Sequence, residues 1–204
     1  MKARGRPPKF DRSEVLLRAM NVFRKKGYQG TSMSDLVDAM RLRSASIYAA
    51  FGSKEKLFDE VLTLYTEQVG RQIWEPLMRE AQIKKAIDAM LRASASNMSS
   101  ENGPGGCLIT LGAIEGGAED MVRDKLHARR QETFHRIAAR LEQAKADNQL
   151  PGMTDTKRIA IFYSAIQQSI ALRARDGASV HELTDLIDTA MNAWPTVIAV
   201  QEKT

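Results

Sequence analysis

Residues 31–57 read TSMSDLVDAMRLRSASIYAAFGSKEKL, and this stretch decides how the N-terminal part of the chain folds. Ser32 and Asp35 have the spacing of a capping box, and the apolar residues after them line one face of a short helix that ends near Met40. A second short helix is expected over 44–50, before Gly52. Two short helices joined by a tight connection are typical of a helix-turn-helix.

Longer helices are expected on both sides of this pair. Apolar residues recur at helical spacing between Leu16 and Phe23, and Gly27 after two lysines is a typical helix end. Ser53 can cap the helix that follows. The first helix would therefore brace the two short ones, and the helix after Ser53 would lead into the rest of the chain.

The remainder of the chain keeps the helical period, without strand-like alternation. Its clearest loop is 99–106, SSENGPGG. The pattern predicts an all-α protein of about nine helices. It divides into a basic arm over 1–10, a helix-turn-helix domain over 11–56 and a larger helical regulatory and dimerisation domain over 57–204.

Charge is distributed unevenly along the chain. Residues 1–56 contain 13 Lys and Arg against 5 Asp and Glu, a net +8, whereas residues 57–204 contain 17 against 20, a net −3. A basic head on a mildly acidic body favours a polyanion as the partner of the head.

The composition and the absence of certain motifs argue against several classes of function. One cysteine permits no intramolecular disulfide, and the three histidines lack the spacing of a zinc site. No phosphate-binding loop, nucleophile elbow or dinucleotide motif occurs, and no apolar run approaches the ~20 residues that span a bilayer. We therefore expect a cytoplasmic protein that is not an enzyme and needs no metal or cofactor.

The expected DNA contacts lie on the second short helix and at neighbouring helix starts. Small or hydroxylated side chains would let the helix approach a major groove, arginines just before it could reach phosphates or guanine edges, and free N–H groups at helix starts attract phosphate. The residues are Thr31, Arg41, Arg43, Ser44, Ala45, Ser46, Tyr48 and Lys54. Alternatively, Tyr48 is a core aromatic and Lys54 a solvated surface residue.

The arm carries a separate signal. In Arg4-Gly5-Arg6-Pro7, two arginines flank a glycine, as in the AT-hooks that lie in narrow A·T minor grooves. Arg4, Arg6 and Lys9 are the expected contacts, and a solvated basic tail is the alternative.

Residues ~10–57 resemble the TetR family of transcriptional regulators (TetR/AcrR type). The resemblance is carried by Gly27-Tyr28, by Thr31-Ser32-Met33, and by the run from Ser46-Ile47-Tyr48 to Ser53-Lys54-Glu55-Lys56-Leu57. It implies an N-terminal DNA-binding domain and a C-terminal helical regulatory domain, although beyond residue 65 only helix lengths and order match.

The sequence departs from the family pattern at two places. Ala49 and Ala50 stand where the family often has an aromatic residue or histidine, and Arg41 and Arg43 stand where it more often has glycine and serine. Contacts with phosphate could therefore be made by these arginines and by the arm instead of by residues 49 and 50.

A helix-turn-helix protein usually pairs so that two recognition helices read one inverted repeat. The family pairs through its last two long helices, here about 155–175 and 180–198. The expected interface residues are Ile159, Tyr163, Ile166, Ile170, Leu183, Leu186, Ile187, Ala190 and Trp194. The alternative is that these stripes face only the core of their own chain.

The helices of 57–147 would enclose a pocket for an unknown small-molecule effector. The candidate lining residues, each of which could instead be plain core, are Tyr65, Met90, Cys107, Leu111, Met121, Phe134, Phe162 and Tyr163. Cys107 follows two glycines at an expected helix start, where the helix dipole favours a reactive thiolate. Its Gly-Cys-Leu context resembles that of family members that sense electrophiles through a cysteine. A small buried apolar residue is the alternative.

These patterns together favour a dimeric, ligand-responsive transcriptional regulator, foremost a repressor that binds a palindromic operator. A low-specificity architectural DNA-binding protein is the second candidate, and an enzyme is the third.

Overall fold

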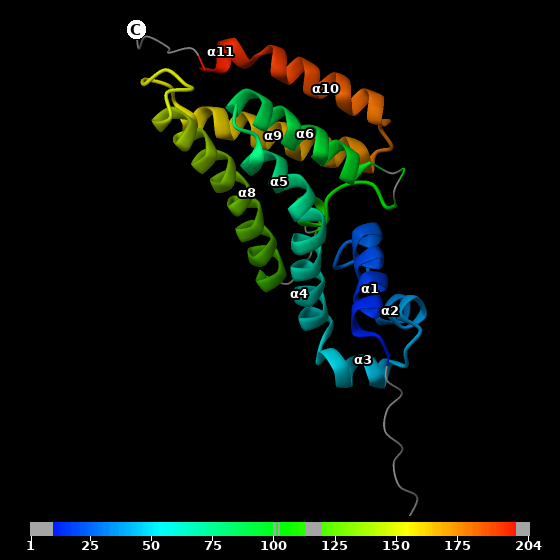
Figure 1. The fold of residues 1–204 in the computed structure, drawn as a ribbon. Helices are drawn as coiled ribbons and strands as arrows, with labels where there is room; N and C mark the ends of the chain where they lie inside the picture. The colour runs from blue at the N-terminus through cyan, green and yellow to red at the C-terminus, as the bar shows by residue number, and fades with distance from the viewer. Residues whose placement is uncertain (1–9, 100, 102, 113–119, 199–204) are drawn as a thin grey trace, which may run out of the picture.

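The computed structural model describes residues 10–99, 101, 103–112 and 120–198, and all regular secondary structure within these ranges is helical (Figure 1). The predicted all-α class is confirmed. The elements are α1 Arg12–Lys26, α2 Met33–Met40, α3 Ser44–Phe51, α4 Lys54–Tyr65, the π-helix η1 Thr66–Gly70, α5 Arg71–Arg79, α6 Ile83–Met98, α7 Leu108–Leu111, α8 Asp120–Ala146, α9 Thr156–Arg175, α10 Val180–Asn192 and α11 Trp194–Ile198.

The helices form a small head and a larger body. Helices α1, α2 and α3 lie at one end of the molecule, while α6, α8, α9 and α10 lie at the other (Figure 1). Helix α4 runs from the head into the body and packs against α1. In the body, α9 contacts α6 and α8, and α10 covers α6 and α9. No described helix is long and apolar enough to cross a membrane.

Side-chain caps set where the helices of the head begin. The Asp11 carboxylate accepts hydrogen bonds from the amides of Ser13 and Glu14. The expected capping box of Ser32 and Asp35 is present at the start of α2. Ser53 Oγ accepts from the Lys56 amide at 3.1 Å, which confirms the expected cap of α4. Each cap provides an acceptor for amides that the first turn of a helix leaves unpaired.

We expect Asp35 to make the head sensitive to strong acid. Its carboxylate pairs with Lys26 Nζ at 2.5 Å and accepts from the Ser32 amide and hydroxyl, and these contacts lower its pKa from 3.8 to about 2. A lowered pKa stabilises the fold above the pKa of the unfolded chain, and this contribution is lost as pH falls through about 2. Asp35→Asn should flatten the stability profile between pH 5 and 2 in urea unfolding, and an unchanged profile would contradict the assignment.

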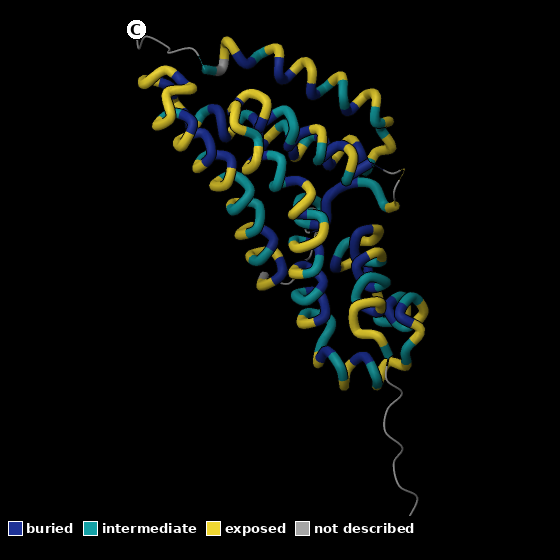
Figure 2. Tube along the Cα trace, in the orientation of Figure 1, coloured by how far each residue is buried: buried dark blue, intermediate teal, exposed yellow. Residues whose placement is uncertain are grey.

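Three aromatic rings hold the head against α4. The rings of Phe23 and Phe58 meet edge to face at 4.9 Å between centroids, and Tyr28 lies 5.0 Å from Phe58. All three residues are buried, and the buried positions of α1 and α4 face each other (Figure 2). The head and α4 therefore share one core.

The sequence interpretation missed α5. Helix α4 passes into it through η1 without a loop, and Pro76 stands inside α5, where proline normally opposes a helix. The signal available was the pair Ile73 and Leu77, which are one turn apart and buried. π-Helical turns are rare overall, and those that occur often lie at functional sites.

The residues predicted for the dimer interface need correction. Most of the predicted interface side chains are buried within this single chain, as in the hydrogen bond from Tyr163 Oη to the Ala190 carbonyl at 3.2 Å. The residues so buried are Ile159, Tyr163, Ile170, Leu183, Ile187, Ala190 and Trp194, while Ile166 and Leu186 are half-buried. The widest apolar stripes of α9 and α10 thus pack against the core of their own chain, as the alternative interpretation held.

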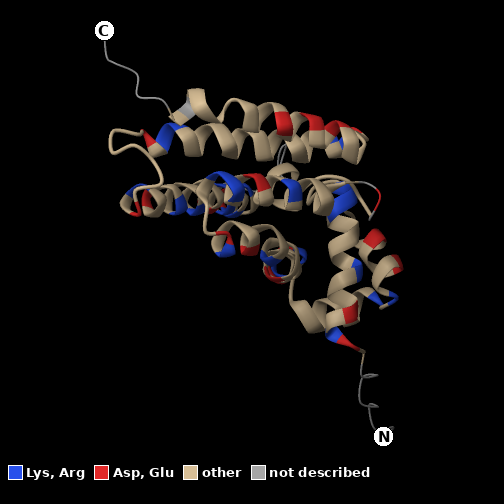
Figure 3. Ribbon diagram, turned by 45° about the horizontal axis from the view of Figure 1, so that its top comes forward, with Lys and Arg blue, Asp and Glu red and all other residues tan. Residues whose placement is uncertain are grey.

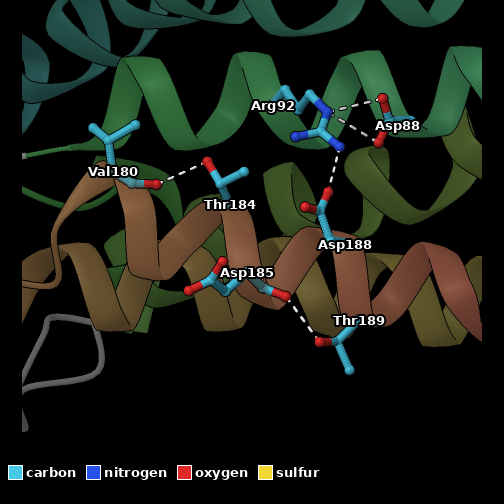
Figure 4. Close-up of polar contacts among 7 residues, drawn as sticks. All are labelled: Asp88, Arg92, Val180, Thr184, Asp185, Asp188 and Thr189. Carbon is cyan, nitrogen blue, oxygen red and sulfur yellow. Dashed lines mark hydrogen bonds and ion pairs between the residues drawn. The ribbon is translucent and has the colours of Figure 1, made fainter.

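Polar contacts also fix α10 on the body. Arg92 of α6 pairs with Asp88 on its own helix and with Asp188 on α10, at 2.9 and 2.5 Å (Figure 4). Acidic residues are spaced along α10 (Figure 3). An ion pair therefore holds α10 against α6.

Candidate nucleic-acid interface and effector cavity

Helix α3 presents one face to solvent and one to the head core. Ile47 and Phe51 are buried, whereas Ser44 and Ala45 are exposed and Tyr48 is 46% exposed. Tyr48 is therefore not a core residue. The exposed side chains are small apart from this tyrosine, so the backbone of α3 can approach a DNA groove closely.

Two exposed arginines flank the connection from α2 to α3. Arg41 ends α2 in the left-handed conformation, with φ 52°, and Arg43 is the N-cap residue of α3. Left-handed backbone favours glycine, and a non-glycine residue there costs about 1–2 kcal/mol. Arg41 thus occupies a backbone conformation that glycine adopts more easily, and its side chain is exposed beside the start of α3.

The structure contradicts one predicted DNA contact and revises another. Thr31 is 1% exposed, and its hydroxyl donates to the Gly27 carbonyl at 2.6 Å, so its side chain stabilises the turn between α1 and α2 instead of facing a phosphate. Lys54 is half-buried, with Nζ 4.3 Å from the centroid of the Tyr28 ring. The lysine therefore lies between the helix start and the aromatic cluster.

Arg12 is a structural link that sequence reasoning missed. Its guanidinium contacts both carboxylate oxygens of Glu60 at 2.6 and 2.8 Å, donates to the Ala50 carbonyl at 3.2 Å and covers the Phe51 ring. This brings the start of α1 beside the end of α3. Arg4, Arg6 and Lys9 lie outside the described residues.

The body contains a small, partly enclosed cavity beside Cys107. Its free volume for a water-sized sphere is about 40 Å³. Of the candidate pocket residues, Tyr65 and Cys107 line it. The other lining residues are Gly70, Ile73, Trp74, Met98, Ile109, Thr110, Arg130, Thr133, Gln167 and Gln168. They come from segments far apart in the chain, including α5. The helical period of the sequence could therefore not identify them as one group.

The other predicted pocket residues lie elsewhere. Met90 and Tyr163 are buried in the core, and Phe134 and Phe162 are half-buried against it. Leu111 lines a separate hollow beside Phe23, and Met121 is 57% exposed. None of these six is among the residues that line the Cys107 cavity.

Polar groups converge on the buried thiol. The Tyr65 hydroxyl is buried and has no hydrogen-bond partner of normal geometry among the described residues. Burial and the nearby Cys107 thiol raise its pKa well above the ordinary value, so the hydroxyl remains a donor. Burial lowers the pKa of the Arg130 guanidinium, which donates to the Ile109 carbonyl at 3.1 Å. Tyr65, Arg130 and Cys107 line the same cavity.

The loop that carries Cys107 is tied to the head. Arg24 of α1 donates to the Pro104 carbonyl at 2.9 Å, and its guanidinium lies 6.0 Å from the centroid of the Tyr65 ring. Arg175, at the end of α9, donates to the carbonyls of Arg24 and Lys25 at 2.5 and 3.0 Å. Loop, cavity wall and the end of α1 therefore form one continuous set of contacts.

This geometry defines a class of protein: a helix-turn-helix regulator whose DNA-reading head is joined to a helical body with an internal cavity. Residues 15–61 match the family model "Bacterial regulatory proteins, tetR family", and residues 84–194 match "Tetracyclin repressor-like, C-terminal domain". The chain belongs to the TetR family of transcriptional regulators.

Similar proteins have related descriptions. The HTH-type transcriptional repressor ComR of Escherichia coli K12 is 31% identical over 203 residues, which cover 97% of this chain and 95% of ComR. A cysteine mutant of the TetR family regulator CifR, solved with 26-base-pair operator DNA, is 37% identical with a TM-score of 0.89, over 93% of this chain and all of that one. A TetR regulator from Chloroflexus aurantiacus is 25% identical with a TM-score of 0.80, over 93% of this chain and 96% of that one.

Proposed function

We propose that this protein is a homodimeric repressor that binds an inverted-repeat operator and releases it when an electrophile reacts with Cys107. The exposed face of α3, with Arg41 and Arg43 at its start, is the observation that carries the DNA-binding part. The repressor ComR and the operator complex of CifR support the same conclusion.

The outward face of α9 is the surface proposed for pairing. Ile161 and Leu172 are 54% and 52% exposed, and Ala165 lies between them on the same side of the helix. Large apolar side chains in such a row favour contact with a second copy. This surface replaces the buried residues that the sequence had favoured.

The effector part depends on the chemistry around Cys107. Its sulfur would add to the β-carbon of an α,β-unsaturated carbonyl compound, forming a C–S bond while the alkene π pair moves toward the carbonyl oxygen. The proton lost by the thiol ends on the α-carbon, so no further reactant is needed. The added group would exceed the small cavity and displace the loop that Arg24 holds through Pro104.

Selection of bound DNA from a random pool tests the function. A palindromic consensus is the expected result, since a symmetric dimer reads two half-sites. A pool that keeps no consensus would instead support the architectural DNA-binding protein. Cys107→Ser separates the effector part: this variant should bind the operator normally and no longer release it after treatment with an enone. Release that persists in this variant would exclude Cys107 as the reactive group.

Arg43→Ala should lower operator affinity several-fold and make its salt dependence shallower, because one phosphate contact releases about one counterion. Fluorescence anisotropy with labelled operator across a range of salt concentrations measures both quantities. Arg79→Ala, which removes an exposed arginine from α5 in the body, is the matched control. Equal slopes for the wild type and Arg43→Ala would show that Arg43 does not contact phosphate.

A further inference from the structure

The Cys107 cavity and an open groove on the surface share one wall. Gly70 and Trp74 line both hollows. The free volume for a water-sized sphere is about 350 Å³ in the groove and about 40 Å³ in the cavity. The other residues of the groove are Thr66, Glu67, Arg71, Glu75, Met78 and Arg136. The groove is thus large enough for a ligand body that the cavity alone could not hold.

Trp74 is the side chain that the two hollows share. Trp74 is half-buried, and the Arg136 guanidinium lies 5.6 Å from the centroid of its ring. A Cβ on Gly70 would stand 3.7 Å from this indole, so the ring lies against a residue without a side chain. Gly70 also ends the π-helix η1. Of the two residues that line both hollows, only Trp74 has a side chain that can rotate.

The opposite side of the cavity faces α9. Gln168 lines the cavity and is exposed, and it lies on the outward side of α9 between Ile161 and Leu172. A second copy on this surface would cover Gln168. In the proposed dimer, the wall at Trp74 is then the side that remains accessible from solvent.

The chemistry of the cavity indicates what the inner end of a ligand must present. The buried Tyr65 hydroxyl makes no hydrogen bond of normal geometry with the described residues, which is costly unless a ligand or water accepts a hydrogen bond from it. In contrast, Gln167 already donates to Ser94 Oγ at 3.1 Å. The Tyr65 hydroxyl therefore lacks an acceptor, which an oxygen atom of a ligand would provide. Cys107 lines the same cavity.

We propose that Trp74 is the gate of the effector site, and that the effector is an elongated electrophile whose carbonyl oxygen accepts from Tyr65 while its apolar tail lies in the groove against Trp74 and Met78. This inference rests on the proposed reaction at Cys107 and specifies its ligand class and access route. Trp74 acts here by position and does not take part in the reaction.

Labelling of Cys107, the single cysteine of the chain, measures access directly. N-Phenylmaleimide and benzyl bromide are similar in size, and iodoacetamide is a small reference reagent. Trp74→Ala should accelerate both bulky reagents several-fold more than iodoacetamide, and Arg136→Ala should do so to a smaller extent. Met153→Ala removes an exposed side chain that lines neither hollow and should leave all three rates unchanged. Operator binding verifies that each variant is folded.

Two outcomes would overturn the proposal. If Trp74→Ala leaves the rates of the bulky reagents unchanged, the reagents reach Cys107 from another side of the cavity, such as the α9 side at Gln168. Tyr65→Phe should slow the maleimide, which carries carbonyl oxygens, relative to benzyl bromide, which has none. Equal slowing would overturn the assignment of the acceptor. These rates are measured without DNA, so failure of the gate is distinguishable from failure of Cys107 as the sensor, which Cys107→Ser reports separately.

Discussion

Ala45→Glu is expected to lower operator affinity about 100-fold or more, because a carboxylate on the exposed face of α3 would meet the phosphates that this face approaches, and such like-charge contacts cost several kcal/mol. The fold should survive, since Ala45 is exposed and an acidic residue in the first turn of a helix is favourable. Anisotropy with labelled operator measures the affinity, and circular dichroism verifies the helical content.

The matched control is Ala128→Glu. Ala128 is exposed on α8, so this variant makes the same change in composition and net charge far from the recognition helix. It should bind almost as tightly as the wild type at physiological salt, where exposed charges beyond about 8 Å are screened. Comparable losses in both variants would mean that α3 does not enter the groove.

Phe23→Ala should reduce the free energy of unfolding by about 3–5 kcal/mol, the usual cost of removing a buried phenyl ring. Phe23 is fully buried and loses its edge-to-face contact with Phe58 in this variant. A hollow of about 120 Å³, lined by Phe23, Gly27 and Leu111 among others, already lies beside the ring, so the void would be enlarged. The loss should lie toward the upper end of this interval.

Urea unfolding at one fixed protein concentration measures this loss, because a dimer gains apparent stability with concentration. Phe23→Leu retains most of the volume and should cost less than about 1.5 kcal/mol. Met78→Ala removes an exposed side chain of α5 and should have almost no effect. A small loss for Phe23→Ala would show that the head and α4 do not share a core.

The sequence predicted the head more accurately than the body. Caps such as Ser32 with Asp35 act within four residues, so the chain itself encodes where these helices begin. The exposed face of α3 was predicted from its small or hydroxylated side chains. Ser44 and Ala45 are exposed as expected, whereas Ser46 is half-buried. The prediction for Thr31 was wrong because its hydroxyl donates to the carbonyl of Gly27. This contact depends on the conformation of the turn between α1 and α2, which the sequence pattern did not show.

The cavity and the pairing surface depend on long-range packing. Tyr65 and Cys107 were selected from the sequence, but Trp74 and Gln167 reach them only through the relative placement of α5 and α9. The stripes of α9 and α10 show the same limitation. A helical period identifies an apolar face but does not say whether that face meets its own chain or another.

The links between head and body have a consequence for building hybrid regulators. Within the described part of the chain, the hydrogen bonds of Arg175 go to main-chain carbonyls at the end of α1, so the body can hold any head whose first helix ends in the same place. The contact with Pro104 differs, because the head must bring its own guanidinium at the position of Arg24. A transplanted head that lacks this arginine would still be seated on the body but would be disconnected from the loop that carries Cys107. Such a hybrid would occupy its operator whether or not the effector is present.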